Sequence, residues 1–343
     1  MNTADRIRAL EDQVLSGKEI AFEDGLFLME LQQKDLFQLY ASANNIRSRF
    51  CGDKVYLCAI TNAKSGACSE DCSFCAQSAR HPTAIETYSL QDTEAILNAS
   101  RTAATNGASS FGIVTAWKGI KKGKTLDKII ESIKAIKADG KVVPDLSLGL
   151  IDDPEVAFML AEAGAEEYNH NLETAKSFYP TICKSHAWEE RYRTLEYARA
   201  AGMRVCSGGI FGLGESLRQR VELAFELKPL QANNTPLNFY HHIEGNAVDI
   251  QKVGRLSALQ ALQIVAVFRF ILPHTILKIA GGRETTLGDF QELMFMTGAN
   301  STMIGHYLTT QGRNPEDDFD LINRSGLSVS EKGCVLPQPA LSR

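Results

Sequence analysis

Three cysteines share one short polar segment of the chain, and they are the residues best suited to do chemistry. Cys68, Cys72 and Cys75 follow the pattern C-x3-C-x2-C. Thiolates are the usual protein ligands of iron–sulfur clusters, and three of them can hold three irons of a 4Fe–4S cubane while the fourth iron stays open. An open iron can chelate the amino and carboxylate groups of a small molecule. The spacing therefore predicts a cluster that binds and activates such a molecule.

Two structural interpretations of these cysteines compete with the catalytic one. A structural zinc site usually takes four ligands in two spaced pairs, and the sequence holds no second C-x2-C. Buried free thiols rarely occur three to a polar, glycine-containing loop. We therefore expect Cys68, Cys72 and Cys75 to hold a 4Fe–4S cluster whose open iron chelates S-adenosylmethionine (SAM) for one-electron cleavage.

The rest of the composition is that of an ordinary globular protein. The chain has 343 residues, of which 44% are hydrophobic and 22% charged, and its formal net charge is −5. Acidic and basic residues alternate along it, which does not favour a nucleic-acid surface. The longest apolar stretch, residues 264–272, is too short to span a bilayer, and the first residues lack an apolar signal segment. We expect a cytoplasmic protein that binds neither nucleic acid nor membrane.

An alternation of strand-like and helix-like segments must position the cysteines. The predicted strands are residues 55–61, 110–115, 142–148, 167–171, 204–210, 236–241, 276–280 and 301–304. Apolar residues recur at helical spacing between them, in residues 126–138, 155–163, 189–201, 217–227, 259–272 and 289–296. Eight short strands followed by helices favour parallel pairing in a closed (β/α)8 TIM-type barrel of the α/β class.

The barrel prediction also places the cysteines in space. A doubly wound open sheet is the main alternative, and the absence of a G-x-G-x-x-G turn after the first strand counts against it. We expect residues 1–45 to form an N-terminal helical extension, residues 46–310 the barrel, and residues 311–343 a tail packed on it. The cysteine segment follows the first predicted strand, so it should lie at the carboxyl-terminal rim, where active sites of such barrels are found.

Five blocks of this sequence resemble the biotin synthase family of radical SAM enzymes, in the family's order. They are NAKSGACSEDCSFCAQSARH (62–81), YNHNLET (168–174), CSGGIFGLGES (206–216), AGGRE (280–284) and TGANSTMIG (297–305). The resemblance implies a homodimeric barrel enzyme that inserts sulfur into dethiobiotin with two SAM molecules and an external electron donor such as flavodoxin or ferredoxin. Each SAM would yield methionine and a 5′-deoxyadenosyl radical, which abstracts hydrogen from an unactivated carbon.

The resemblance also implies roles for individual residues. Cys68, Cys72 and Cys75 match the ligands of the radical cluster. The residues implied to bind SAM are Asn169, Asn171, Glu173, Gly212 and Gly214; the family commonly has aspartate where Glu173 stands. The residues implied to bind substrate are Asn171, Asn238 and Arg283. Asparagine suits a cyclic urea because its amide both donates and accepts hydrogen bonds.

An auxiliary 2Fe–2S cluster is the point at which this sequence departs from the family. The family's ligands are three cysteines on strands two, three and five and an arginine on strand seven. This chain keeps the strand-five cysteine as Cys206, and Arg283 matches the arginine. However, Gly112 and Asp145 stand where the other two cysteines are expected.

Two cysteines elsewhere in the sequence could compensate for this loss. Cys58 lies on the first predicted strand, and Cys183 follows the fourth. We hypothesise that Cys58, Cys183 and Cys206 converge on an auxiliary iron–sulfur cluster of uncertain type, with Arg283 nearby. The alternative is that all three are buried thiols that act as small hydrophobes. The remaining cysteines, Cys51 and Cys334, have no predicted role.

Two other functions remain open at this point. The missing auxiliary cysteines favour a different radical SAM barrel enzyme, such as a carbon-skeleton mutase or a hydrogenase-maturation enzyme. Asn171, Asn238 and Arg283 together favour biotin synthase. A non-catalytic iron–sulfur carrier or redox sensor is disfavoured by the SAM-type motif and by a full barrel. Cleavage of SAM by the reduced protein would separate an enzyme from a carrier.

Overall fold

The computed structural model describes residues 2–330 and contains a closed ring of eight parallel strands. They are β1 (Lys54–Lys64), β2 (Ser110–Thr115), β4 (Val143–Ser147), β6 (Glu167–Asn169), β7 (Arg204–Cys206), β9 (Asn234–Phe239), β10 (Ile276–Ile279) and β11 (Ser301–Met303). Each pairs in parallel with the next, and β11 pairs back to β1. The predicted (β/α)8 barrel is confirmed, and its closure leaves no edge within this ring.

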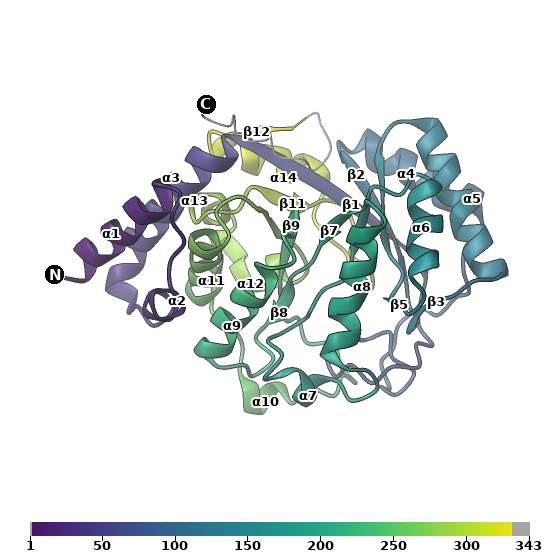
Figure 1. Cartoon of the computed structure of the whole chain (residues 1–343), viewed down its shortest axis with the longest axis horizontal. Helices are drawn as coiled ribbons and strands as arrows, with labels where there is room; N and C mark the ends of the chain where they lie inside the picture. The colour runs from purple at the N-terminus through teal and green to yellow at the C-terminus, as the bar shows by residue number, and fades with distance from the viewer. Residues whose placement is uncertain (1, 331–343) are drawn as a thin grey trace.

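Helices surround the barrel and bury apolar residues between themselves and the strands (Figure 1). They are α4 (Thr93–Thr105), α5 (Lys124–Asp139), α6 (Pro154–Glu162), α8 (Trp188–Ala200), α9 (Leu217–Leu227), α11 (Ala258–Ile271), α12 (Arg283–Leu287) and α13 (Leu293–Met296). In α5, Leu126, Ile129, Ile133 and Ile136 recur at helical spacing and are buried. Gly140 ends this helix in the left-handed conformation that glycine tolerates best.

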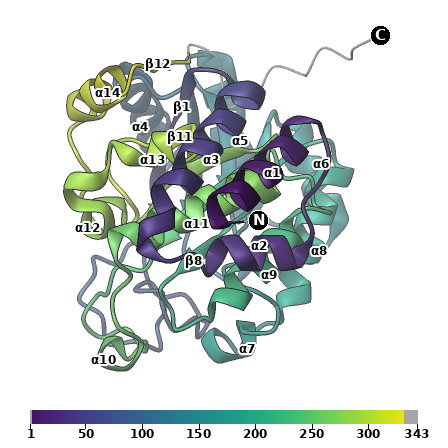
Figure 2. The same cartoon turned by 90° about the vertical axis from the view of Figure 1, so that its left-hand side faces the viewer.

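Three N-terminal helices precede the barrel and are α1 (Thr3–Leu15), α2 (Phe22–Met29) and α3 (Leu36–Cys51), with a 3-10 turn at Gln33–Asp35. Of these, α2 and α3 pack on the outer side of α11, and α1 packs on α3 (Figure 2). Their packing explains why α11 is buried on all sides over its last eleven residues. Arg269 is fully buried there, because its guanidinium donates to backbone carbonyls, including that of Gly298 at 2.8 Å, and to Asn300 Oδ1 at 2.9 Å.

The last described segment returns to the amino-terminal end of the barrel. Helix α14 (Pro315–Arg324) is followed by β12 (Ser328–Val329), which pairs with the first two residues of β1. The predicted tail extends to residue 343, and residues 331–343, Cys334 among them, lie outside the described residues. Within residues 2–330, no helix is both long enough and apolar enough to cross a membrane.

The predicted strand 204–210 is interrupted in the structure. Strand β7 ends at Cys206, and a short β8 (Gly209–Phe211) resumes pairing with β9. At Gly208 the backbone approaches Pro236 so closely that a Cβ would lie 1.9 Å from the proline carbonyl oxygen. Pro236 also has no N–H to donate, so the ladder breaks at this point. The predicted helix 289–296 is broken as well, into a 3-10 turn (Gly288–Phe290) and α13.

Short elements and loops build the carboxyl-terminal end of the barrel, at the bottom of Figure 1. They include β3 (Gly119–Ile120) paired with β5 (Leu150–Ile151), α7 (Tyr179–Ile182) and α10 (Ile250–Val253). The long segment after β1, which carries the cysteine triplet, also lies at this end.

Candidate active site

A cavity of about 410 Å³ runs from this end of the barrel into its interior. All three cysteines of the triplet line its mouth, and Cys58 and Lys278 line its inner part. Asn169, Asn171, Glu173 and Asn238 also line it. A wider hollow of about 730 Å³ lies at the surface between α4, α5 and α14, but none of the predicted site residues lines it. The smaller cavity is therefore the candidate active site.

The cysteine segment is shaped by a backbone turn that needs glycine. Gly66 and Ala67 both have positive φ, and a Cβ on Gly66 would lie 2.4 Å from Thr87 Oγ1. The Cys68 N–H then donates to the Gln77 carbonyl at 3.0 Å, and the Ala79 N–H donates to the Cys68 carbonyl at 2.8 Å. These bonds fold the segment back on itself, and all three cysteines line the same cavity.

The environment of these thiols suits a metal cluster. Burial raises the pKa of the Cys68 thiol, and it raises the pKa of Cys75 to about 11. The pKa of Cys72 is also raised, chiefly by a hydrogen bond to the Cys183 sulfur. Buried thiols of this kind become thiolates when a bound metal supplies the compensating positive charge. Three such thiols at one cavity fit a 4Fe–4S cluster with an open iron.

Glu173 is held in a strained conformation at the cavity wall. Its φ is +69°, which is rare for a residue other than glycine. Its Oε1 lies 3.3 Å from the Arg191 guanidinium, whereas its buried Oε2 has no hydrogen-bond partner in the protein. Burial raises the pKa of this carboxyl. An unpartnered acceptor at a cavity wall fits a ligand that carries hydroxyl groups.

The side chains of Asn171 and Asn238 already make hydrogen bonds to backbone groups of the protein. Asn171 Oδ1 accepts a hydrogen bond from the Gly208 N–H at 3.2 Å. Asn238 donates to the Gly209 carbonyl at 3.2 Å and accepts from the Gly281 N–H at 2.9 Å. Each amide can make four hydrogen bonds, so both keep capacity for a ligand.

Two predicted SAM-binding glycines lie beside the cavity without lining it. Gly212 and Gly214 have φ values of +93° and +103°. The Gly212 N–H donates to the Glu215 carboxylate at 3.0 Å, which fixes the turn before α9. Neither glycine is among the residues that line the cavity.

The barrel interior next to the cavity is charged, which is unusual because such interiors are normally filled by Val, Ile and Leu. Its thiol and charged groups come from five strands and are Cys58, Asp145, Glu167, Cys206 and Lys278, of which Cys58 and Lys278 line the cavity itself. Lys278 Nζ lies 3.9 Å from Cys206 Sγ. Burial, and then the charge of Glu167, raise the pKa of Asp145. Asp145 Oδ1 has no hydrogen-bond partner in the protein. A constellation of this kind marks a functional site rather than a packed core.

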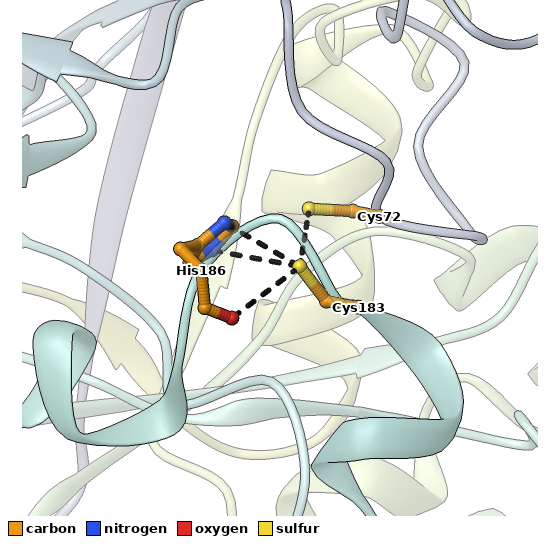
Figure 3. A group of neighbouring side chains, drawn as sticks. All are labelled: Cys72, Cys183 and His186. Atoms are coloured by element: carbon orange, nitrogen blue, oxygen red, sulfur yellow. Dashed lines mark hydrogen bonds between the residues drawn. The ribbon is translucent and has the colours of Figure 1, made fainter.

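The structure corrects the prediction that Cys183 joins Cys58 and Cys206. Cys183 follows α7 at the cavity mouth, and its sulfur lies 3.8 Å from that of Cys72 (Figure 3). The Ser73 N–H donates to the Ile182 carbonyl at 2.8 Å, which holds the segment against the cysteine loop. Cys58 instead lines the inner part of the cavity with Lys278, and Cys206 Sγ lies 3.9 Å from Lys278 Nζ, so Cys183 does not join these two thiols.

The structure also corrects the predicted position of Arg283. This residue begins α12, and its guanidinium donates to Asp318 of α14 at 2.9 Å and to the Thr302 hydroxyl at 2.7 Å. It does not line the cavity. Because Arg283 lies beyond the end of β10, its side chain packs toward α14. The cation that does enter the barrel interior from β10 is Lys278.

Arg191 is a site residue that the sequence reasoning missed. It is buried on α8 and donates to Tyr179 Oη at 2.8 Å and to the Asn171 carbonyl at 2.9 Å, and it lies 3.9 Å from Cys72 Sγ. A signal was present, because Arg191 stands three residues after Trp188 and four before Leu195 on the apolar face of its helix. Lys278, within the apolar strand ILKI, gave a similar signal.

Comparison with known proteins agrees with this geometry. Residues 63–227 match the Radical SAM superfamily, and residues 236–328 match the Biotin and Thiamin Synthesis associated domain. The chain is 45% identical to biotin synthase of Geotalea uraniireducens over 94% of its own length and 98% of that protein. It is 44% identical to biotin synthase of Geobacter sulfurreducens over 94% and 97% of the two chains.

Solved structures with much lower identity share the fold. Methylornithine synthase superposes with a TM-score of 0.81 at 19% identity, over 94% of this chain and 97% of that one. The [FeFe]-hydrogenase maturase HydG superposes with a TM-score of 0.79 at 15% identity, over 95% of this chain and 75% of that one. Together with the sequence matches over nearly the whole chain, the geometry leads to one conclusion: this chain belongs to the biotin synthase family of radical SAM enzymes.

Proposed function

We propose that this chain inserts sulfur into dethiobiotin to form biotin. One observation supports this most strongly: a single cavity is lined by the cysteine triplet at its mouth, by Asn171 and Asn238 midway, and by Cys58 at its inner end. A substrate in the middle of this cavity would lie between a radical source and a second sulfur-containing site. Family membership implies the 4Fe–4S cluster, SAM and an auxiliary iron–sulfur cluster.

We assign the radical cluster to Cys68, Cys72 and Cys75. With the cluster and SAM bound, one-electron cleavage of SAM supplies the hydrogen-abstracting radical. Glu173 offers its free Oε2 to ribose hydroxyls, and Asn169 and Asn171 supply amide groups beside it. The turn that contains Gly212 and Gly214 lets backbone approach the adenine.

Asn171 and Asn238 are the proposed contacts to the ureido ring of the substrate. After its two backbone hydrogen bonds, Asn238 keeps one N–H and one oxygen lone pair, which complement the C=O and N–H groups of a cyclic urea. The surrounding barrel excludes water, which protects a reactive radical from side reactions.

The auxiliary cluster is proposed to be held by Cys58 and Cys206. Asp145, with its unpartnered Oδ1, and Glu167 are further acidic groups beside them, and Lys278 offsets part of the negative charge. Two thiols and a carboxylate differ from the three cysteines of the family pattern. The type of this cluster therefore depends on this chain's own ligands.

The Cys58→Ala/Cys206→Ala variant is expected to lose the iron and sulfide of the auxiliary cluster and to keep SAM cleavage. The reason is that the radical cluster uses other thiols. Iron and sulfide content, with Mössbauer spectra of the reconstituted protein, measures this. Cys51→Ala removes a buried thiol that does not line the cavity and serves as the control. Unchanged iron and sulfide in the double variant would contradict the assignment.

Anaerobic incubation of the reconstituted protein with dethiobiotin, SAM and a strong reductant should produce biotin, detected by mass spectrometry. Formation of 5′-deoxyadenosine without biotin would exclude dethiobiotin as the substrate.

The Asn238→Ala variant should turn over dethiobiotin at least about tenfold more slowly, because a buried substrate group would lose a hydrogen-bond partner.

A second candidate is another radical SAM reaction on a smaller and more polar molecule. The charged groups Asp145, Glu167 and Lys278 next to the cavity favour it, since these groups could bind the amino or carboxylate groups of such a substrate. The incubation described above separates the two candidates, because only the first yields biotin.

The remaining proposals concern the setting of the enzyme. An external donor such as flavodoxin or ferredoxin supplies the electron, the chain forms a homodimer, and it works in the cytoplasm. Residues 1–45 serve as an extension that covers the barrel, 46–310 as the catalytic barrel, and 311–343 as a tail. Family resemblance supports the donor and the dimer.

A further inference from the structure

Two segments far apart in the chain place a second set of metal-binding side chains at the cavity mouth. Cys72 comes from the loop after β1, whereas Cys183 and His186 follow α7 (Figure 3). The two sulfurs lie 3.8 Å apart, and Cys183 Sγ lies 3.4 Å from Nδ1 and 3.9 Å from Nε2 of His186. All three residues are buried, and one ligand atom from each lies within 4.8 Å of the others.

These separations match ligands around a single tetrahedral ion. Thiolates bind zinc at about 2.3 Å and imidazole nitrogens at about 2.0 Å, so a tetrahedral site separates two sulfurs by about 3.8 Å and a sulfur from a nitrogen by about 3.5 Å. The observed sulfur–sulfur distance is 3.8 Å, and Cys183 Sγ lies 3.9 Å from His186 Nε2, within a few tenths of an ångström of the second value. Little rearrangement would be needed to bind an ion.

A carboxylate orients the histidine for this role. Glu70 Oε2 lies 2.7 Å from His186 Nδ1, and both side chains are buried. A carboxylate accepts hydrogen bonds, so it holds the ring proton on Nδ1 and leaves Nε2 available to a metal. Metal-binding histidines in proteins are commonly oriented in this way.

Hydrogen bonds between backbone and side-chain groups hold the two ligand-bearing segments together. The Ser73 N–H donates to the Ile182 carbonyl at 2.8 Å. Asp71 Oδ1 accepts from the N–H groups of Lys184 and Ser185, each at 3.0 Å, and the Asp71 N–H donates to Ser185 Oγ at 3.1 Å. The ligands are therefore positioned before any ion arrives, which lowers the ordering cost of binding.

We propose that the cluster-free chain binds one tetrahedral thiophilic divalent ion, zinc or ferrous iron, through Cys72, Cys183 and His186. The fourth position is left for water or another small ligand. Cys72 is also assigned to the radical cluster, and in that respect the inference rests on the proposed function. Because both use the Cys72 thiolate, the ion and the 4Fe–4S cluster cannot be bound at the same time.

Cobalt(II) is the probe for this site, because its spectrum reports tetrahedral geometry and the number of bound thiolates. The titration uses the full-length chain, cluster-free and anaerobic, with Cys58→Ala and Cys206→Ala in the background to remove the inner thiols. We expect one cobalt ion per chain, with d–d bands of a tetrahedral site and sulfur-to-cobalt charge transfer from two thiolates.

Ligand variants in this background decide where the ion lies. Cys183→Ala and His186→Ala should each weaken cobalt affinity at least about tenfold, and His186→Cys should restore binding with a third thiolate. Cys68→Ala and Cys75→Ala should leave the affinity unchanged. Loss of binding in Cys68→Ala or Cys75→Ala, with none in Cys183→Ala and His186→Ala, would overturn the proposal, because the ion would then lie on the cysteine loop alone. Circular dichroism checks that each variant is folded.

Competition experiments identify which ion the site prefers and test whether that ion hinders assembly of the 4Fe–4S cluster. Zinc should displace cobalt at lower concentration than ferrous iron, as the usual order of affinities requires. Zinc loaded beforehand should also slow 4Fe–4S reconstitution at least about tenfold in the parent chain but not in Cys183→Ala. Equal reconstitution rates with and without zinc would refute the exclusion at Cys72. None of these measurements depends on biotin formation, so failure of the proposed function would leave them interpretable.

Discussion

Alanine in place of Cys68, Cys72 or Cys75 should abolish SAM cleavage, with 5′-deoxyadenosine formation falling at least about 100-fold. Each thiol lines the cavity mouth, and the three together supply the thiolates that a cubane with one open iron requires. With only two thiolates, a second iron loses its protein ligand and the cluster becomes unstable. Deoxyadenosine is measured by chromatography after anaerobic reduction with SAM.

A matched control is provided by another buried cysteine. Cys51 lies at the end of α3, with its sulfur 3.7 Å from the Pro273 carbonyl oxygen, and it does not line the cavity. Cys51→Ala should therefore cleave SAM at the parent rate. Normal SAM cleavage in any one of the three cavity variants would refute the cluster assignment for that residue.

Arg191→Ala should destabilise the fold by about 3–5 kcal/mol and weaken SAM binding. The guanidinium is buried and contacts Glu173 Oε1, the Asn171 carbonyl and Tyr179 Oη. Interaction with Glu173 raises the pKa of Arg191 against the opposing effect of burial, so the group is charged in the folded protein. Alanine would leave the Glu173 carboxylate buried without its cation. Urea unfolding of the cluster-free chain measures the stability.

A double variant separates this electrostatic cause from lost packing. Arg191→Met/Glu173→Gln removes both charges and keeps most of the volume, so it should recover much of the stability that Arg191→Ala loses. It should not recover SAM binding, because Glu173 is the proposed ribose contact. If Arg191→Ala is as stable as the parent chain, the ion pair contributes nothing to the fold.

The sequence by itself determined the barrel fold and the chemistry of the cysteine triplet, because both depend on local patterns of residues. The helical periodicity of residues such as 126–138 and the short apolar strands both depend on residues that are neighbours in sequence. Eight strands that alternate with helices are compatible with only a few topologies. Cys68, Cys72 and Cys75 lie within eight residues, so one turn at Gly66 suffices to bring them together. Their chemistry could be predicted without knowledge of distant contacts.

Only the tertiary structure decided which distant side chains share a site. Cys183 meets Cys72 because hydrogen bonds between residues 71–73 and 182–185 hold the α7 segment at the cavity mouth, which no periodicity encodes. Lys278 enters the barrel interior whereas Arg283, just past the strand, packs against α14. A fully buried strand is covered on both faces, so its sequence does not indicate which residues point inward. That direction, fixed by the closure of the barrel, determines the charged inner end of the site.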